Sequence, residues 1–197
     1  KELVERMFTA EDPDLRRASI DALVERDDGC EEPLPDAYAT MAKDPDPTVR
    51  AAAVRALGHC GPAAHVPTLV AALRDDDVKV RWDAAVALDG ERGEAAVDPL
   101  IRSLREDKSK DVRAAAARSL QHDRLPRVVE ALIAALNDPE FAVRYEARSS
   151  LKALTGEDAG IDPRAWRELL AKKRELFCPP EVCKPRPWWD PFGLFSE

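Results

Sequence analysis

The sequence predicts an all-α solenoid, a superhelix of about five helical hairpins followed by a capping helix and a tail rich in proline and aromatic residues. The first observation behind this prediction is a recurring pattern: an aliphatic residue, then an arginine, with a small residue three positions later and a leucine seven positions later. The pattern occurs five times, at Arg16, Arg50, Arg81, Arg113 and Arg144. Successive arginines lie 34, 31, 32 and 31 residues apart, a spacing typical of stacked repeats.

Composition is the second observation. Hydrophobic residues make up 45% of the 197 residues and charged residues 35%, whereas aromatic residues make up only 6%. This mixture favours helix and leaves little material for a sheet. The 16 prolines fall largely between the expected helices and in the last 20 residues, so they separate helices.

Each arginine is predicted to lie in a helix with a buried stripe. In the third copy, Val80, Ala84 and Leu88 are spaced by four residues, which is helical rather than strand-like. The aliphatic residues before the arginines are Leu15, Val49, Val80, Val112 and Val143. The leucines after them are Leu23, Leu57, Leu88, Leu120 and Leu151.

A second apolar helix precedes each of the later arginine-bearing helices. The expected ranges are 35–43, 63–74, 95–105 and 126–136. Prolines at or near their first turns, where a missing amide hydrogen costs little, fit these starts: Pro62, Pro67, Pro99 and Pro126. Each repeat is therefore a hairpin of two helices, which we call A and B, with the arginine on B.

The turn between A and B has its own regularity. Six residues before the arginine stand Asp44, Asp75, Asp107 and Asp138, whereas the first repeat has Ala10. Aspartate in such a turn can cap the B helix. It can also pair with the arginine of its own or a neighbouring repeat. We expect these aspartates, together with Arg50, Arg81, Arg113 and Arg144, to form a structural ladder that fixes the register between repeats.

The pattern D-P-x-x-x-V-R-x-x-A-x-x-x-L resembles the HEAT repeat family, and more narrowly the short HEAT-like repeats of phycocyanobilin lyases. It is seen in DPDPTVRAAAVRAL and NDPEFAVRYEARSSL, and the resemblance covers about residues 3–155. The resemblance implies the fold. It does not fix the function, because the family includes scaffolds, adaptors, bilin lyases, DNA glycosylases and di-iron hydroxylases.

The chain divides into three parts on this basis: a repeat array over 1–155, a cap over 156–177 and a tail over 178–197. Asp162 and Pro163 are suited to start the cap helix, and Trp166 gives it an apolar face. The cap would close the open end of the array's core.

A non-catalytic protein-interaction scaffold, or a structural or accessory subunit of a larger assembly, is the predicted function. The three histidines, His59, His65 and His122, are not followed by the glutamates of a di-iron site, and no fourth ligand completes a zinc site around Cys60. No nucleophile motif or phosphate-binding loop is present. We therefore expect no catalytic residue, metal, cofactor or small-molecule substrate.

Charge and hydropathy narrow the partner class. The formal net charge is −8, with 30 basic against 38 acidic residues, which disfavours nucleic acid. No run approaches the ~18–20 apolar residues of a membrane span. The expected partner is a protein whose identity the sequence does not give.

The cysteines predict two disulfide pairs. Cys30 and Cys60 follow the B helices of the first two repeats, and corresponding loops of adjacent repeats are neighbours. Cys178 and Cys183 flank a short loop in the tail. Two pairs favour an oxidising compartment, so we expect an exported protein in a bacterial periplasm or on a cell surface. The alternative is four free thiols in the cytosol.

Aromatic residues that break the repeat are the predicted partner-binding residues. Trp82 and Tyr145 occupy the position after the ladder arginine, where other repeats have small or charged residues. They would line a groove if the B helices form the concave face. The tail contributes Trp188, Trp189, Phe192 and Phe195. These tail residues either insert into another protein or dock back on the array.

Two further function classes stay open. A role resembling the bilin lyases, in which the chain brings a chromophore to a protein, is the main alternative. A DNA-repair role of the glycosylase kind requires a basic, aromatic cleft, and the charge balance makes it the weaker alternative.

Overall fold

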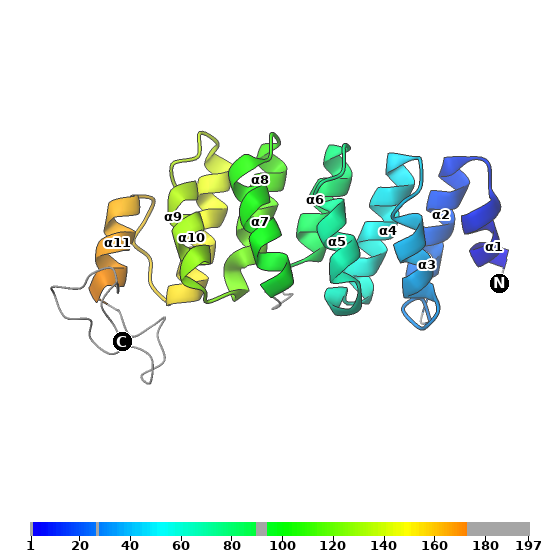
Figure 1. Cartoon of the computed structure of the whole chain (residues 1–197), viewed down its shortest axis with the longest axis horizontal. Helices are drawn as coiled ribbons and strands as arrows, with labels where there is room; N and C mark the ends of the chain where they lie inside the picture. The colour runs from blue at the N-terminus through cyan, green and yellow to red at the C-terminus, as the bar shows by residue number, and fades with distance from the viewer. Residues whose placement is uncertain (1, 27, 90–93, 173–197) are drawn as a thin grey trace, which may run out of the picture.

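The computed structural model describes residues 2–26, 28–89 and 94–172. Within these residues every regular element is helical, in eleven α-helices and two short 3-10 helices, which confirms the predicted all-α solenoid (Figure 1). No helix in the described ranges combines the length and apolar character needed to cross a bilayer.

Five A helices and five B helices alternate along the array. The A helices are α1 (Glu2–Thr9), α3 (Leu34–Met41), α5 (Val66–Ala72), α7 (Glu94–Glu106) and α9 (Pro126–Ala135). The B helices are α2 (Pro13–Val24), α4 (Pro47–Cys60), α6 (Val78–Ala87), α8 (Lys110–Ser119) and α10 (Phe141–Thr155). The 3-10 helices are η1 (Pro62–His65) and η2 (Leu120–His122).

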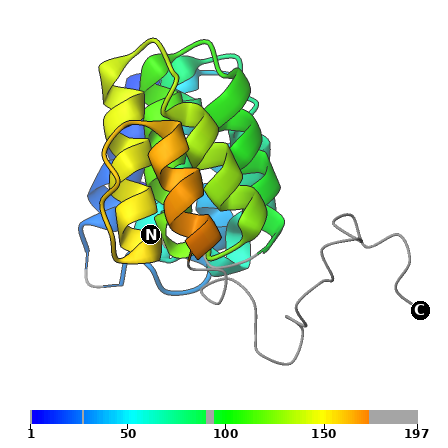
Figure 2. The ribbon, with the colours of Figure 1, turned by 90° about the vertical axis from the view of Figure 1, so that its left-hand side faces the viewer.

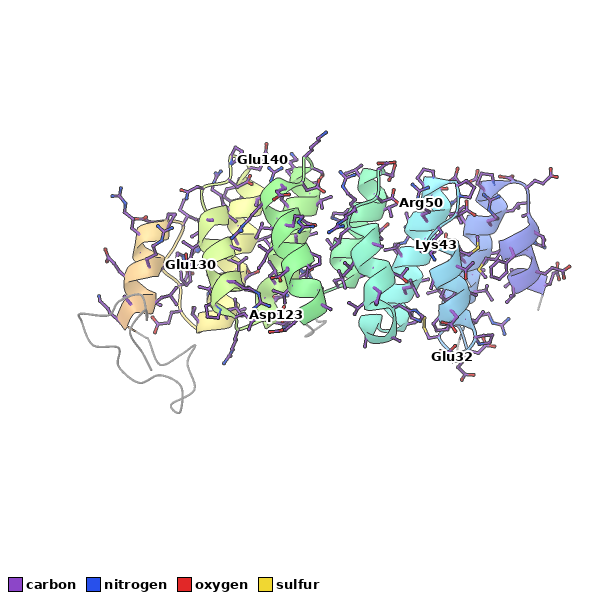
Figure 3. The ribbon with its side chains drawn as sticks, in the orientation of Figure 1. Glu32, Lys43, Arg50, Asp123, Glu130 and Glu140 are labelled. Carbon is purple, nitrogen blue, oxygen red and sulfur yellow. A yellow bond between two sulfur atoms is a disulfide. The ribbon has the colours of Figure 1, made fainter. Side chains whose placement is uncertain are left out.

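The two sets of helices form two layers, seen end-on in Figure 2. Contacts link neighbours along the stack, with α2 on α4, α4 on α6, α6 on α8 and α8 on α10. The A–B turns gather at one edge and the B–A loops at the other. In Figure 3, Arg50 and Glu140 lie toward the turn edge, and Glu32 and Asp123 lie toward the loop edge. Each repeat thus presents equivalent positions side by side.

The repeating apolar positions form the core. The four aliphatic residues before Arg50, Arg81, Arg113 and Arg144 are fully buried, and the five repeat leucines are at most 2% exposed. Leu15 is different, with 47% exposure. It lies in the first B helix, at the N-terminal end of the described stack, where no earlier helical pair among the described residues packs against it.

Four of the five B helices begin at a side-chain cap, whereas α10 begins at Glu140 without one, and the ladder aspartates do not provide these caps. The caps are Asp12, Asp46, Asp77 and Ser109, each accepting the backbone amide two residues on. The ladder aspartate lies two residues before the cap and accepts that residue's own amide, as Asp44 does from Asp46 at 2.8 Å. Capping of B helices by Asp44, Asp75, Asp107 and Asp138 was therefore a wrong expectation, because these carboxylates stand too early in the turn to reach the helix amides.

The array closes with α11 (Pro163–Lys172), which packs near α9. Helix α10 is followed by the capping residue Gly156, whose φ of +75° suits glycine. Asp162 accepts the amide of Arg164 at 2.8 Å and so caps α11. Trp166 is fully buried, and its indole N–H donates to the Gly160 carbonyl at 2.8 Å. These contacts place α11 where the sequence predicts a cap.

Candidate functional site

The ladder arginines and aspartates meet across the repeat boundaries. Arg16, Arg50, Arg81 and Arg113 each donate from Nε and Nη2 to both carboxylate oxygens of the aspartate in the next repeat. The pairs are Arg16–Asp44, Arg50–Asp75, Arg81–Asp107 and Arg113–Asp138, with every Nε–Oδ2 distance at 2.8 Å. Planar bidentate pairs of this kind fix geometry as well as charge. Each rung therefore sets the register of two repeats.

The same guanidinium also binds the turn of its own repeat. Arg50 donates from Nη1 to the carbonyl oxygens of Asp44 and Pro45, both at 3.0 Å. Arg81 repeats this with Asp75 and Asp76. One arginine thus joins two turns: the carboxylate comes from the following repeat and the carbonyls come from its own.

These contacts shift the titration of the pair. The hydrogen bond to the neighbouring carboxylate raises the pKa of Arg50, and likewise of Arg16, Arg81 and Arg113. Burial raises the pKa of Asp75 and Asp138. The hydrogen bonds from arginine and backbone amide, together with the nearby positive charges, outweigh burial, so the net pKa of each lies below its ordinary value. The lowered pKa values favour the charged form of Asp75 and Asp138 in their rungs.

The two ends of the ladder differ from its middle. Ala10 stands where the other turns have aspartate, and its carbonyl oxygen accepts Nη1 of Arg16 at 2.8 Å. At the other end, Arg144 binds the carbonyls of Asp138 and Pro139. No carboxylate within the described ranges completes the rung of Arg144. Among the described residues the ladder thus has four complete rungs, and its fifth arginine makes the two turn contacts without a carboxylate.

A disulfide joins the first two repeats at the loop edge. Cys30 and Cys60 are bonded, with their Cα atoms 5.0 Å apart. Cys30 lies in the loop after α2, whereas Cys60 is the last residue of α4 rather than a loop residue. The structure therefore contains the first of the two expected pairs. Cys178 and Cys183 lie outside the described residues.

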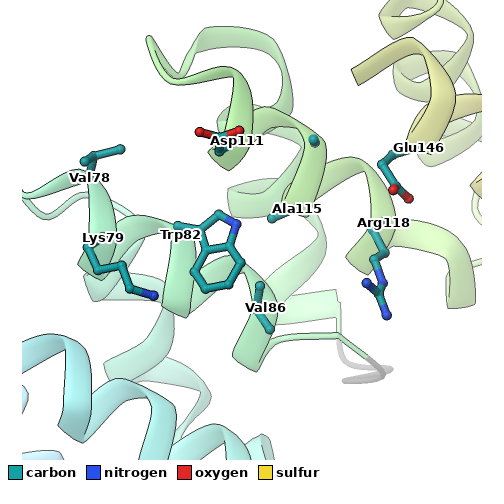
Figure 4. Close-up of a pocket in the computed structure, with 9 residues that line it drawn as sticks. Val78, Lys79, Trp82, Val86, Asp111, Ala115, Arg118 and Glu146 are labelled. Carbon is teal, nitrogen blue, oxygen red and sulfur yellow. The ribbon is translucent and has the colours of Figure 1, made fainter. Parts of the chain in front are cut away.

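Trp82 lies in a groove on the B-helix face (Figure 4). The groove has a volume of about 520 Å³ and is formed by α6, α8 and the start of α10. The ammonium group of Lys79 lies 4.1 Å from the centroid of the Trp82 ring, a cation–π contact. Its other lining residues are Val78, Val86, Asp111, Ala114, Ala115, Arg118 and Glu146. Apolar side chains and side chains of both charges therefore line the same groove.

A second groove, of about 650 Å³, continues from the other side of Trp82 across α4 to α2. Asp83 lies in its wall with a side chain only 1% exposed, bonded to Lys79 at 3.0 Å and to Arg55 at 3.3 Å. Arg55 also reaches Asp21 on α2 at 3.3 Å. Burial raises the pKa of Asp83, and the two cations counteract this only in part. An ion-pair network thus connects three B helices along the groove.

Tyr145 does not share a groove with Trp82. It is 55% exposed on α10, and its ring lies 6.1 Å from that of Phe141, which is 69% exposed. The equivalent position in the fourth repeat is Ala114, which lines the Trp82 groove. The two aromatic residues therefore occupy equivalent positions on one face but separate surroundings.

Several side chains of the site carry no repeat signal in the sequence. Lys79, Asp83 and Val86 form the surroundings of Trp82, yet in the sequence they resemble ordinary helix residues. The i, i+4 spacing of Lys79 and Asp83 was the available signal for that pair.

Two serines add hydrogen bonds between neighbouring B helices: the hydroxyl of Ser119 donates to the Ala85 carbonyl at 2.7 Å, and that of Ser150 to the Ala117 carbonyl at 2.8 Å.

The remaining predicted site residues fall into two groups. His59, His65 and His122 belong to no cluster of three or more potential metal ligands in the described part of the chain. Trp188, Trp189, Phe192 and Phe195 lie outside the described residues, so their predicted role in partner binding stays a prediction.

Comparison with known families and structures identifies the architecture. The profile described as HEAT repeats matches residues 1–88, 34–121 and 97–169. No curated protein sequence matches the chain.

Among solved structures, an engineered protein has a TM-score of 0.63 at 19% identity and covers 89% of this chain and 96% of its own. The complex of CpcE and CpcF of phycocyanin lyase from Nostoc sp. PCC7120 has a TM-score of 0.63 at 20% identity, covering 86% and 68%. A designed armadillo repeat protein in complex with the peptide (KR)4 has a TM-score of 0.62 at 17% identity, covering 92% and 93%. At these identities the likeness concerns the fold.

Proposed function

This chain belongs to the HEAT repeat family, and from that premise we propose that it is a non-catalytic protein-interaction scaffold or an accessory subunit of a larger assembly. It binds a protein partner through the B-helix face. The observation that carries the proposal is the position of Trp82 between two grooves of about 520 and 650 Å³. A half-buried tryptophan in a groove is the usual form of an interface anchor.

The chemistry of the groove favours a polypeptide over a small molecule. Trp82 and Val86 offer apolar surface, whereas Lys79, Asp111 and Arg118 offer charged groups of both signs along the same groove. A helix or extended segment can meet such alternating surfaces over several residues. The two grooves are open and together run across successive B helices, so they can accommodate a peptide segment of several residues.

Relatives in fold form complexes of their own. CpcE and CpcF are found in complex with each other, and the designed armadillo repeat protein is found with a (KR)4 peptide. The proposal for this chain rests on its own groove, and these structures illustrate that a stacked array can present such a surface.

A photo-crosslinking amino acid at position 114, where Ala114 lines the Trp82 groove, tests the proposal and leaves Trp82 in place. We expect it to capture a specific protein from the native host, whereas the same amino acid at Glu130, which is exposed on α9, captures none. Trp82→Ala should weaken recovery of that partner at least about tenfold, the loss of a central anchor. Leu15→Ala removes apolar surface that is 47% exposed on α2 and outside both grooves, and it serves as the control.

The outcomes separate the function classes. Equal recovery with Trp82→Ala and the wild-type chain would contradict the groove as the binding site. Visible absorbance from a pigment bound to the purified chain would instead support the alternative resembling the bilin lyases. A salt-dependent mobility shift with DNA would support the DNA-repair alternative.

The tail and the compartment complete the proposal. Alanine at Trp188 and Trp189 is expected to weaken partner recovery without lowering thermal stability; a collapse of stability would mean that the tail docks on the array. We further propose export to the periplasm or cell surface, supported by the Cys30–Cys60 disulfide, since such bonds persist in oxidising compartments. Fractionation of the native host tests this location.

A further inference from the structure

Arg144 makes the turn contacts of a ladder arginine, but no described residue provides it with a partner carboxylate. Its Nη1 donates to the carbonyl oxygens of Asp138 at 2.7 Å and Pro139 at 2.8 Å, as in the other rungs. In those rungs Nε and Nη2 hold an aspartate with donor–acceptor distances between 2.7 and 3.2 Å. Within residues 2–26, 28–89 and 94–172, no acceptor binds Nε or Nη2 of Arg144. The guanidinium is therefore oriented by its own turn for a carboxylate that no described residue provides.

The surroundings of Arg144 are apolar and open. Phe141 and Tyr145, on either side of it in α10, are 69% and 55% exposed. The Arg144 Cζ lies 5.9 Å from the Phe141 ring centroid. In Figures 1 and 2 the cap helix α11 begins below the level of the α9–α10 turn, so it lies against the lower part of the last repeat. The exposed rings of Phe141 and Tyr145 and the guanidinium of Arg144 together form a small surface that is partly apolar and partly positively charged.

We propose that Arg144, with Phe141 and Tyr145, binds an aspartate in a helix–helix turn of a different protein, which adds a fifth rung to the ladder. The four complete rungs define the ligand. The ligand is an aspartate whose two carboxylate oxygens accept hydrogen bonds from Nε and Nη2 of the arginine. The same carboxylate also accepts the backbone amide two residues later, as Asp138 does from Glu140 at 2.9 Å. An apolar residue beside it packs on the two rings. This site lies apart from the Trp82 grooves and does not depend on them.

A second copy of this chain does not fit the site. Head-to-tail stacking would bring the first turn of one copy to the last turn of another, but that first turn has Ala10 in place of the aspartate. The four ladder aspartates are already bound within their own chain. We therefore place the carboxylate on another protein, and the Arg144 signal of the free chain tests this against a carboxylate from residues 173–197 of the same chain.

NMR of the full chain tests the proposal directly through the arginine Nε–H signals. In the free chain we expect persistent signals from the four paired arginines and a weak, exchange-broadened signal from Arg144. The probe is a synthetic peptide that copies residues 135–147, ALNDPEFAVRYEA, and so presents an Asp-Pro-Glu turn followed by the start of a B helix. Its addition should sharpen and shift the Arg144 signal in a saturable manner and leave the other four unchanged.

Matched variants identify the contacts. A peptide with Asp138→Asn should bind at least about tenfold more weakly, because the charged bidentate pair is lost. In titrations followed through the NMR signals of the peptide, Arg144→Gln in the chain should abolish binding, and Arg144→Lys should weaken it, since lysine has no planar fork. Phe141→Ala should weaken binding without affecting the four ladder signals, which also report that each variant is folded. Arg105→Gln, on an exposed α7 residue, is the control.

Three results would overturn the proposal. Equal binding of the Asn peptide would show that the carboxylate is not recognised. An Arg144 signal as persistent as the other four in the free chain would show that the chain's own residues already fill the site. An equal shift with inorganic phosphate at the same concentration would show a general anion site rather than a receptor for an aspartate turn.

Discussion

The turn edge and the B-helix face of this array are built from the same repeats but differ in uniformity. At the turn edge, four successive repeats place arginine and aspartate in nearly the same bidentate contact. On the B-helix face, the residue directly after each arginine changes from repeat to repeat, and it is a tryptophan only in the third. Uniform positions hold the stack together, and varied positions are available for recognition.

The end of the ladder refines this contrast. Arg144 belongs to the uniform pattern by sequence, yet it is next to exposed Phe141 and Tyr145 and has no carboxylate among the described residues. The role of a repeat arginine therefore depends on which repeat it belongs to as well as on the repeat pattern.

Removing the disulfide tests whether the ladder alone sets the register. A Cys30→Ser, Cys60→Ser double variant should lose about 3–4 kcal/mol of unfolding free energy, from the loop entropy of a 30-residue separation. The Nε–H signals of the four paired arginines should persist. Urea unfolding and NMR check both points, and reduction of the wild-type chain should reproduce the loss. Four free thiols in the denatured wild-type chain would contradict the disulfide.

Breaking an interior rung should cost more than removing the last arginine. Arg50→Ala leaves the Asp75 carboxylate largely buried without its partner, so we expect a loss of about 2–3 kcal/mol. Arg144→Ala removes the contacts to two carbonyls and the contact with the exposed Phe141 ring, and it should cost about 1 kcal/mol or less. Urea midpoints of both, with Arg105→Ala as an exposed control, measure the difference. Equal losses would mean that Arg144 is paired like the others.

Crowding the B helices tests how closely the varied face is packed. A Cβ on Gly58 would lie 2.6 Å from Cβ and 2.9 Å from Cα of Ala87 on the next B helix. Gly58→Ala should therefore destabilise the chain by about 1–3 kcal/mol. Adding Ala87→Gly should restore most of the loss, because it removes the opposing methyl group. Thermal unfolding of the single and double variants shows whether the contact is responsible.

Acid should weaken the ion pairs of the turn edge. The folded pKa values of Asp75 and Asp138 lie below the ordinary value of 3.8, so their contribution is present above about pH 4 and is lost as pH falls toward the lowered values. Asp158, bonded to Arg148 beside the cap, has its pKa lowered to about 2 and should titrate last. Urea midpoints at several pH values give the slope. Arg50→Ala should make that slope shallower, and an unchanged slope would contradict the assignment to Asp75.

The face residues should matter least for stability. Trp82→Ala should cost about 1 kcal/mol and Tyr145→Ala no more than about 0.5 kcal/mol, because the first ring is half-buried and the second is mostly exposed. Urea unfolding measures both. A large loss for Trp82→Ala would assign the tryptophan to the core rather than to recognition.

Periodicity made the fold and the ladder partners predictable. The recurring arginine, its leucine and its aspartate are local signals, and stacking brings their equivalents together in every repeat. The direction of pairing was not predictable, because own-repeat and next-repeat pairs satisfy the same spacing. The capping role assigned to Asp44 failed for a related reason: Asp44 and Asp46 are both turn aspartates, and only the backbone path shows which one reaches the helix.

The grooves were less predictable than the ladder. Trp82 was identified because it breaks the repeat, but the burial of Asp83 and its contacts to Lys79 and Arg55 depend on how closely α4 and α6 approach. That distance is set by Gly58 and Ala87, which carry no charge or aromatic signal. Tyr145 had the same sequence signal as Trp82, yet no described cavity includes it with Trp82, since Ala114 and α8 lie between them.

The forward direction of each rung has a consequence for synthesis on the ribosome. Every complete rung joins an arginine to an aspartate only 25–28 residues later. A repeat can therefore be locked as soon as the next A helix has emerged, while the rest of the chain is still being made. Such short-range closure favours fast folding. We expect the array to fold in order from its N-terminal end. The aspartate of each newly synthesised turn would then bind the arginine of the preceding repeat.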